Sequence, residues 1–236
     1  MVNAFVAIED QRFWTHNGID VRGIFRAFAK GAASGHFNEG ASTLTQQLIK
    51  NQVFNVGLDE TTFMDKLERK IQEQYLAIEL EKQYTKEQIV EYYLNTIYLG
   101  RGVSGVQAAS EKYFGKDMTE LTISEIAVIA GIPQNPSRYD PVANPDENKK
   151  RRAEVLKKML DQEYITQQQY DEAVADDVYA RIDAEHEVQL AESDVNTFYQ
   201  DAIINGVIEK FMDMYGCTKS EAENKLYTGG YEIYSA

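Results

Sequence analysis

All four prolines of this 236-residue chain fall in one stretch, between Pro133 and Pro145. Proline lacks a backbone donor and breaks helices, so this stretch predicts a loop and leaves the long segments on either side free to be helical. Apolar residues make up 43% of the chain and charged residues 26%, which argues for a folded globular protein rather than a disordered one. Strand signals are weak and confined to roughly 178–190 and 229–235. We therefore expect a mainly α fold.

Capping patterns indicate where several helices begin. A threonine followed three residues later by Gln or Glu can satisfy two backbone donors at a helix N-terminus. Such pairs occur at Thr85–Gln88, Thr122–Glu125, Thr166–Gln169 and Thr218–Glu221. They predict helices from these points, including one over 122–130 that stops at Gly131, and further helices over 146–160 and 166–176.

Apolar residues between Thr62 and Lys82 recur at spacings of three and four, the stripe of an amphipathic helix. The stripe consists of Phe63, Leu67, Ile71, Tyr75 and Ile78. Residues 17–61 differ, because they contain repeated glycines that leave the backbone free. We expect part of that segment to be mobile, as loops that gate active sites are.

The net charge of −14 is concentrated at one end of the chain. Residues 161–236 carry 4 Lys or Arg and 17 Asp or Glu, so the first 160 residues are nearly neutral. Nucleic acid is an improbable partner, since phosphate binding needs a basic footprint. The single cysteine, Cys217, allows neither an internal disulfide nor a cysteine metal cluster, and the three histidines lack metal-ligand spacing.

No apolar run approaches the ~18 residues of a membrane span. The opening Met1-Val2-Asn3 does not look like a signal peptide. These features predict a soluble chain, with any anchor lying upstream of it.

Glu9 is the first candidate for chemistry. It follows the apolar residues Ala4, Phe5 and Val6. An apolar wall raises the pKa of a carboxyl group, which suits a general base or acid. The alternative is a solvated Glu-Asp pair at a helix end.

Two further segments could bind an anion. Gly40 is followed by hydroxyl residues and then a helical run, where Gln47 and Lys50 would be neighbours. Such a segment is either an anion site or an ordinary capped surface helix. Arg69 and Glu73 are four apart, and form either a helix ion pair or a cation and carboxylate facing a cleft.

Other patterns favour structural roles. Residues 86–95 have the pattern of a packing helix, and 151–159 that of a basic helix face. Residues 100–105 match G-x-G-x-x-G, but a dinucleotide site needs a strand before the glycines and here a helical segment precedes them. We therefore exclude a nucleotide role for this turn.

Together and in this order, the blocks resemble the peptidoglycan glycosyltransferase domain (glycosyltransferase family 51) of class A penicillin-binding proteins and monofunctional transglycosylases. The resemblance covers about residues 2–160. It is carried by Glu9-Asp10-x-x-Phe13-x-x-His16-x-Gly18, Gly40-x-Ser42-Thr43-x-x-Gln46-Gln47-x-x-Lys50-Asn51, Arg69-Lys70-x-x-Glu73, Glu91 through Asn95, and Arg151-Arg152-x-x-Val155-Leu156-x-x-Met159.

The resemblance implies a lysozyme-like, two-lobed helical domain with a membrane-facing jaw. Its substrate would be lipid II, joined to a nascent glycan chain at the membrane surface, and the full-length protein would work on the outer face of the bacterial plasma membrane within a cell-wall synthesis complex. Glu9 would be the general base and Glu73 the second essential carboxylate. Glu73 would either hold a divalent cation, Mg²⁺ or Mn²⁺, on the pyrophosphate or tune the basic residues.

The resemblance also implies a set of substrate-binding residues. They are Asp10, Phe13, His16, Ser42, Thr43, Gln46, Gln47, Lys50, Asn51, Arg69 and Lys70. Lys50 and Arg69 would stabilise the departing pyrophosphate. The family often has a further basic residue after Asn51, and residues 52–62 contain none, so the resemblance leaves one phosphate contact unassigned.

The predicted domains are 1–177, the glycosyltransferase domain without its anchor helix, and 178–236, a short mixed acidic linker toward an absent transpeptidase domain. Neither Ser-x-x-Lys nor Lys-Thr-Gly occurs, so β-lactam binding is not predicted. Two other functions stay open. One is a lytic transglycosylase or lysozyme-like muramidase, which also uses acidic residues in a helical cleft. The other is a non-catalytic helical interaction domain that binds a partner through its acidic tail.

Overall fold

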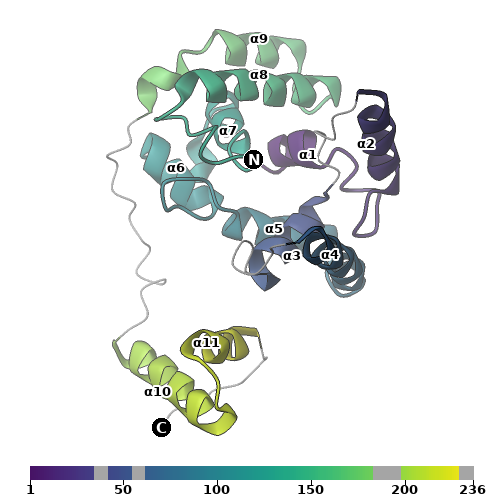
Figure 1. Cartoon of the computed structure of the whole chain (residues 1–236). Helices are drawn as coiled ribbons and strands as arrows, with labels where there is room; N and C mark the ends of the chain where they lie inside the picture. The colour runs from purple at the N-terminus through teal and green to yellow at the C-terminus, as the bar shows by residue number, and fades with distance from the viewer. Residues whose placement is uncertain (35–41, 55–61, 183–197, 229–236) are drawn as a thin grey trace. The chain divides into compact units, whose positions relative to one another are not determined.

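A computed structural model describes residues 1–34, 42–54, 62–182 and 198–228. Within these ranges the chain is helical and contains no strand, only an isolated bridge between Tyr98 and Ser104 (Figure 1). The helices are α1 (Val2–Glu9), α2 (Val21–Ser34), α3 (Leu44–Val53), α4 (Phe63–Gln83), α5 (Lys86–Thr96), α6 (Val106–Phe114), η1 (Met118–Glu120), α7 (Ile123–Ala130), α8 (Pro145–Asp161), α9 (Gln167–Ala175), η2 (Val178–Arg181), α10 (Phe198–Tyr215) and α11 (Lys219–Thr228). The prediction of a mainly α fold is confirmed.

The chain divides into two compact units, residues 1–188 and 189–236. In the first unit, α8 packs on α1, α7 and α9, while α3 packs on α4 and α5. Figure 1 shows the first group as the upper layers of this unit and the second as its lower layer. The second unit is a pair of packed helices, α10 and α11.

Helix α1 lies at the centre of the first unit. Its residues 4–7 are all buried, and Phe5 and Val6 have no exposed surface. A short helix that is apolar all round is stable only when surrounded by protein. Because α1 ends at Glu9, burial of this helix holds that carboxylate inside the unit.

The predicted capping boxes are present. Thr85, Thr122 and Thr166 each cap the helix expected after them, and the Thr218–Glu221 pair bonds in the same way before α11. Thr43 and Thr62 add two further boxes, at α3 and α4. The proline-containing stretch is a loop up to Pro145, which is the first residue of α8. Proline suits that position because the first helical N–H has no intrahelical partner.

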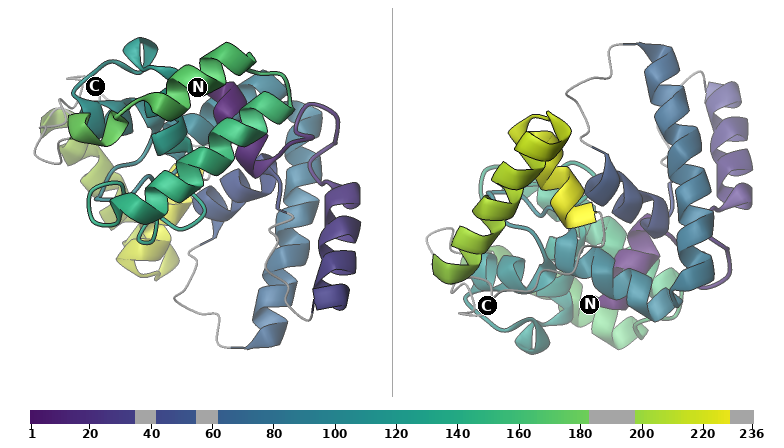
Figure 2. Two further views of the ribbon diagram at one scale, coloured as in Figure 1. Left: turned by 90° about the horizontal axis from the view of Figure 1, so that it is seen from above. Right: turned by 90° about the horizontal axis from the view of Figure 1, so that it is seen from below.

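The amphipathic stripe of α4 forms a helix as expected, but its apolar side faces outward. Leu67, Ile71 and Tyr75 are 42%, 59% and 63% exposed, whereas Glu73 and Ala77 on the opposite side are fully buried. Gly18 explains the close packing there, because a Cβ atom at this glycine would lie 2.6 Å from the carbonyl group of Ala77. Figure 2 shows the N-terminal end of α4 projecting beyond α3, the helix that packs on it.

Three expectations need comment. Residues 178–181, expected to begin a strand, form the 3-10 helix η2, because Val178 is buried in the core and the Tyr179 hydroxyl donates to Asn148 at 2.6 Å. The two compact units divide at 188/189, and the predicted domain boundary at 177/178 stays a prediction. Part of the segment 17–61, expected to be mobile, is helical in α2 and α3. Residues 35–41 and 55–61 of that segment, and the expected strand positions 183–190 and 229–235, lie outside the described residues.

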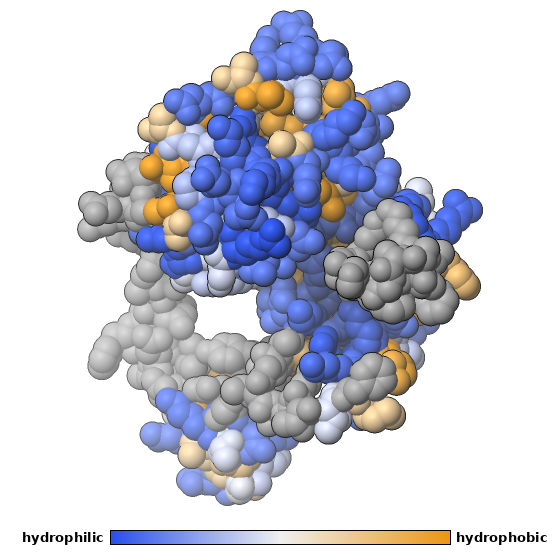
Figure 3. Space-filling view, turned by 45° about the horizontal axis from the view of Figure 1, so that its top comes forward, coloured by the Kyte–Doolittle hydropathy of each residue, from blue (hydrophilic) through white to orange (hydrophobic). Residues whose placement is uncertain are grey.

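Figure 3 shows a mostly hydrophilic face with smaller apolar patches, in agreement with a mean hydropathy of −0.46. Among the described residues, no helix combines the length and apolarity needed to cross a bilayer.

Candidate active site

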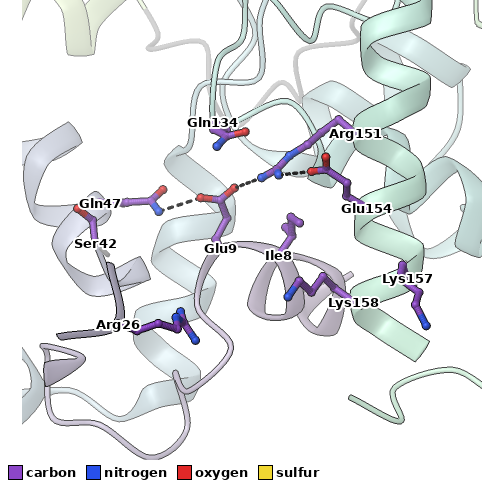
Figure 4. Close-up of a pocket in the computed structure, with 10 residues that line it drawn as sticks. All are labelled: Ile8, Glu9, Arg26, Ser42, Gln47, Gln134, Arg151, Glu154, Lys157 and Lys158. Carbon is purple, nitrogen blue, oxygen red and sulfur yellow. Dashed lines mark hydrogen bonds and ion pairs between the residues drawn. The ribbon is translucent and has the colours of Figure 1, made fainter. Parts of the chain in front are cut away.

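Glu9 lies between two donors that come from distant parts of the chain (Figure 4). Gln47 Nε2 donates to Glu9 Oε2 at 3.0 Å, and Arg151 Nη2 donates to Glu9 Oε1 at 3.3 Å. The Glu9 side chain is only 10% exposed. α3 and α8 thus each contribute one donor to the carboxylate at the end of α1.

The pKa of Glu9 is raised above its ordinary value. Burial is the main cause, because the charged form loses hydration. The hydrogen bond from Gln47 and the charge of Arg151 oppose this rise in pKa, and the neighbouring Asp10 adds to it. A raised pKa makes the carboxylate a stronger proton acceptor, as suits a general base.

Gln47 is held in place by a residue of α5. The Tyr93 hydroxyl donates to Gln47 Oε1 at 3.0 Å, which leaves the amide nitrogen directed at Glu9. Tyr93 is completely buried, and burial raises the pKa of its hydroxyl well above the ordinary value. Helix α5, expected to be structural, therefore also supports the site through this residue.

One cavity of about 470 Å³ lies between Glu9 and α4, and we call it the α4-side cavity. Its lining includes Glu9, Ser42, Gln46, Gln47, Lys50, Asn51, Lys66, Arg69, Lys70, Glu73 and Gln134. Glu73 is fully buried and pairs with both Arg69 and Lys70, the latter at 2.6 Å. Lys70 Nζ also donates to Ser42 Oγ at 2.7 Å. The two predicted carboxylates thus line one cavity together with four cationic side chains.

A second cavity of about 400 Å³ lies on the other side of Glu9, and we call it the α8-side cavity. It shares Glu9, Ser42, Gln47 and Gln134 with the first and adds Ile8, Arg26, Arg151, Glu154, Lys157 and Lys158 (Figure 4). Glu9 is therefore the carboxylate common to two adjoining, cation-lined cavities.

Nine of the predicted site residues line the α4-side cavity, and four do not line either cavity. Phe13 is fully buried in the core. Asp10 accepts from the Leu44 backbone N–H and from His16 Nε2, both at 2.9 Å. Thr43 caps α3 and donates to the Gly18 carbonyl at 2.7 Å. These four side chains pack and orient the elements that carry Glu9 and Gln47.

The segment 151–159 forms the expected basic helix face only in part, because Lys157 and Lys158 are exposed but its two arginines are buried. Arg151 and Arg152 are 8% and 4% exposed, and Arg151 contacts Glu9. A signal was available, since Arg151 precedes the buried Val155 and Met159 by four and eight residues and so shares their face. Similarly, α3 is largely buried and is not the surface helix of the alternative interpretation.

Lys66 was also missed. It lines the α4-side cavity four residues beyond the segment 52–62 in which the further basic residue was sought. Lys66 is therefore a candidate for the further cation that the segment 52–62 lacks. The helical periodicity of α4 supplies the reason, because Lys66 lies three and four residues before Arg69 and Lys70 and shares their side of the helix.

The side chains present do not fit a protein-held divalent cation. Both carboxylate oxygens of Glu73 are already paired with cations, and Lys50 and Lys66 line the same cavity. No group of three potential acidic, histidine or cysteine ligands occurs within the described part of the chain. We therefore derive no chemical step through a metal.

Comparisons with known proteins show the relatives of this chain. Residues 1–160 match the family model Transgly, described as Transglycosylase. The chain is 42% identical over 235 residues to Penicillin-binding protein 1A of Escherichia coli (strain K12). The aligned region covers 100% of this chain and 25% of that protein. It is 41% identical over 230 residues to Penicillin-binding protein 1F of Bacillus subtilis (strain 168), covering 98% and 29%.

A crystal structure of Penicillin-Binding Protein 1A from Haemophilus influenzae aligns with 57% of this chain and 18% of its own, at 34% identity and a TM-score of 0.41. The chain spans about a quarter to a third of the length of the curated relatives named here. The match to the family model extends over residues 1–160, which is more than half of the chain. The chain belongs to the transglycosylase family, the peptidoglycan glycosyltransferases found in class A penicillin-binding proteins.

Proposed function

We propose that this chain polymerises lipid II into glycan strands with Glu9 as the general base, releasing undecaprenyl pyrophosphate. The observation that carries the proposal is the position of Glu9 where two cation-lined cavities adjoin. A reaction between two lipid-linked diphosphates needs an anion site on each side of the reacting atoms.

In the proposed step, Glu9 removes the proton from the 4-hydroxyl of the acceptor sugar. The hydroxyl oxygen forms a bond to the anomeric carbon of the growing chain, and the bond from that carbon to the pyrophosphate oxygen breaks with inversion. Gln47 supports the base by holding one carboxylate oxygen, which leaves the proton to be accepted on the remaining lone pairs. The raised pKa of Glu9 makes it a stronger proton acceptor than an ordinary glutamate.

The leaving pyrophosphate is assigned to the α4-side cavity. Lys50, Lys66, Arg69 and Lys70 line it. Fixed cations next to developing phosphate charge stabilise the transition state without reorganisation. Glu73 pairs with Arg69 and Lys70 and so keeps their side chains oriented. The acceptor is assigned to the α8-side cavity, where Arg26, Lys157 and Lys158 can meet its diphosphate.

The test is Glu9→Gln assayed with lipid II. The variant should fold and lose polymerisation by about 10²–10⁴-fold, the usual contribution of a general base. Glu147→Gln is the matched control, because Glu147 lies on α8 outside both cavities and pairs with Arg138 and Lys150. Polymerisation by Glu9→Gln at the wild-type rate would refute the assignment of the base. Release of soluble fragments from preformed glycan, with no polymer from lipid II, would instead favour the muramidase alternative.

We further propose that the apolar side of α4 meets the membrane that carries the lipid substrate, on the outer face of the plasma membrane. Met64, Leu67, Ile71 and Tyr75 form this exposed row, and Phe25 on α2 is 70% exposed. Amphipathic helices with such faces bind at the bilayer interface. Three of the four cations of the α4-side cavity, Lys66, Arg69 and Lys70, come from the same helix, so a lipid diphosphate anchored in the membrane could reach them.

A further inference from the structure

Arg151 lies between two carboxylates that differ in burial. Its Nη2 donates to Glu9 at 3.3 Å and its Nη1 to Glu154 at 2.7 Å. The Glu154 side chain is 61% exposed, whereas those of Arg151 and Glu9 are 9% and 10% exposed. Figure 4 shows the three side chains in line along the α8-side cavity.

The two distances indicate which carboxylate holds the guanidinium. Strong charge-assisted N–H···O bonds measure about 2.7–2.9 Å, so the bond to Glu154 is of full strength and the bond to Glu9 is stretched. Arg151 Nε is buried and donates to no described group. The guanidinium is thus oriented by Glu154, and Glu9 receives only part of its attraction.

This sharing matters because the guanidinium stays charged at every relevant pH. A full ion pair with Arg151 would strongly favour the ionised form of Glu9 and oppose its acceptance of a proton. Once Glu9 holds a proton, Arg151 would be a nearly buried cation without a counter-ion if Glu154 were absent. An unpaired buried charge is strongly destabilising.

Resting on the proposed role of Glu9, we propose that Glu154 is a positioning residue that holds Arg151 back from Glu9, and so keeps Glu9 a competent proton acceptor. Glu154 also remains as the counter-ion of Arg151 after the proton has moved. This role follows from the three side chains and the distances between them.

Other charged or titratable groups face Glu9 from every packed element. They are Asp10 beside it, Arg26 on α2, Lys50 on α3, Lys66, Arg69, Lys70 and Glu73 on α4, Tyr93 on α5, and Lys157 and Lys158 on α8. All of them are unchanged in the variants below. Differences between those variants therefore report on Arg151 and Glu154.

The experiment measures the rate of lipid II polymerisation against pH for the 236-residue chain and three variants. In Glu154→Gln, Arg151 loses its pairing with the Glu154 carboxylate and can move closer to Glu9. The acid limb of the pH–rate profile should therefore move to lower pH by about 0.5, a threefold change in rate on that limb. In Arg151→Gln the limb should move to higher pH by about 1. Glu147→Gln, the same substitution on the same helix as Glu154→Gln, should leave the limb in place.

A second readout does not depend on activity. The carboxyl carbons of glutamate are labelled with ¹³C, and the Glu9 resonance is assigned by its loss in Glu9→Gln and titrated without substrate. Movement of the Glu9 titration in opposite directions in Glu154→Gln and Arg151→Gln supports the proposal, even if no protein polymerises lipid II and the proposed function itself fails. If Glu154→Gln leaves the Glu9 titration unmoved, the proposal is overturned, whatever happens to the rate. Since Glu154 is exposed, that variant decides the question even if Arg151→Gln does not fold.

Discussion

At the scale of single residues, the site is set by how burial and hydrogen bonding compete at one carboxylate. Glu9 is placed by the apolar α1, which makes its ionised form unfavourable, and is then supplied with two donors. The neighbouring Asp10 is also a carboxylate, but it accepts hydrogen bonds from Leu44 N–H and His16 and so has a structural role. Adjacent carboxylates thus take separate roles because their partners differ.

The raised pKa of Glu9 makes folding stability depend on pH. For a carboxyl group whose folded pKa is raised, the stabilising contribution is present below its unfolded pKa and is lost as pH rises through the folded pKa. Glu9→Gln has no ionisable group at this position, so it does not lose this stabilising contribution as pH rises. The variant should therefore gain stability relative to wild type between about pH 4 and pH 8, by about 1.4 kcal/mol for every tenfold difference in the acidity of Glu9 between the unfolded and folded states. Urea unfolding at both pH values measures the difference in the free energy of unfolding between the variant and the wild type. If the wild type instead becomes more stable relative to the variant as pH rises, the prediction is contradicted.

At the scale of secondary structure, α4 presents two different faces. One face carries Lys66, Arg69, Lys70 and Glu73 into the α4-side cavity. The other exposes the row that includes Leu67 and Ile71. Helix α4 turns its polar side toward a cavity, where Glu73 is fully buried, and leaves its apolar side exposed, which reverses the usual arrangement of a soluble protein. This arrangement suits the lipid-linked diphosphate substrate that we propose.

Ile71→Glu tests that exposed face. Burying an isoleucine in an apolar phase stabilises by about 1.5–3 kcal/mol, so binding of the chain to phosphatidylcholine vesicles should weaken by about tenfold or more. Gln72→Glu adds the same charge to the neighbouring exposed position and should have little effect. Cosedimentation with vesicles measures both. Equal loss of binding in the two variants would mean that charge, and not the apolar face, governs the interaction.

At the scale of the whole molecule, the two compact units have separate cores in the described residues. The larger core ends with Val178, and the smaller is built from Ile208, Ala222 and Leu226. The acidic excess of the chain also lies mainly beyond residue 160. All the residues that line the two cavities around Glu9 belong to the first unit.

A chain ending at residue 182 should therefore retain the fold of the first unit and its activity on lipid II. Its thermal midpoint should lie within about 4 °C of the corresponding transition in the full chain, a difference of about 1 kcal/mol or less for a domain of this size. Scanning calorimetry of both proteins measures it. A larger fall, or loss of activity in the shorter chain, would show that the second unit supports the first.

Much of the local structure could be predicted from the sequence. Threonine capping boxes and the proline cluster located helix starts and a long loop, because they act over three or four residues. Helix α2 was not anticipated, since its glycines at 23 and 31 suggested a free backbone. Val178 was expected in a strand but enters a helical core, where tertiary packing overrides a weak local preference.

Some residues of the site could likewise be predicted from the sequence, and others could not. Glu9, Lys50, Arg69 and Glu73 were identified from local motifs, and all of them line the α4-side cavity. Their proposed roles remain predictions for the experiments above. Arg151 was misassigned to a basic surface, although its spacing from Val155 and Met159 contained a signal. Tyr93 could not be assigned to Gln47, because sequence spacing carries no information about contacts between separate helices.

Local patterns in the chain were enough to predict the helical class, the helix starts and the family, because each depends on residues near one another in the sequence. The tertiary structure decided which groups share the environment of Glu9. Gln47, Tyr93 and Arg151 come from three different helices, and their distances to one another are set by packing of the core rather than by local preference. The acidity of a buried carboxyl group depends on those distances, so it was fixed only when the helices had assembled.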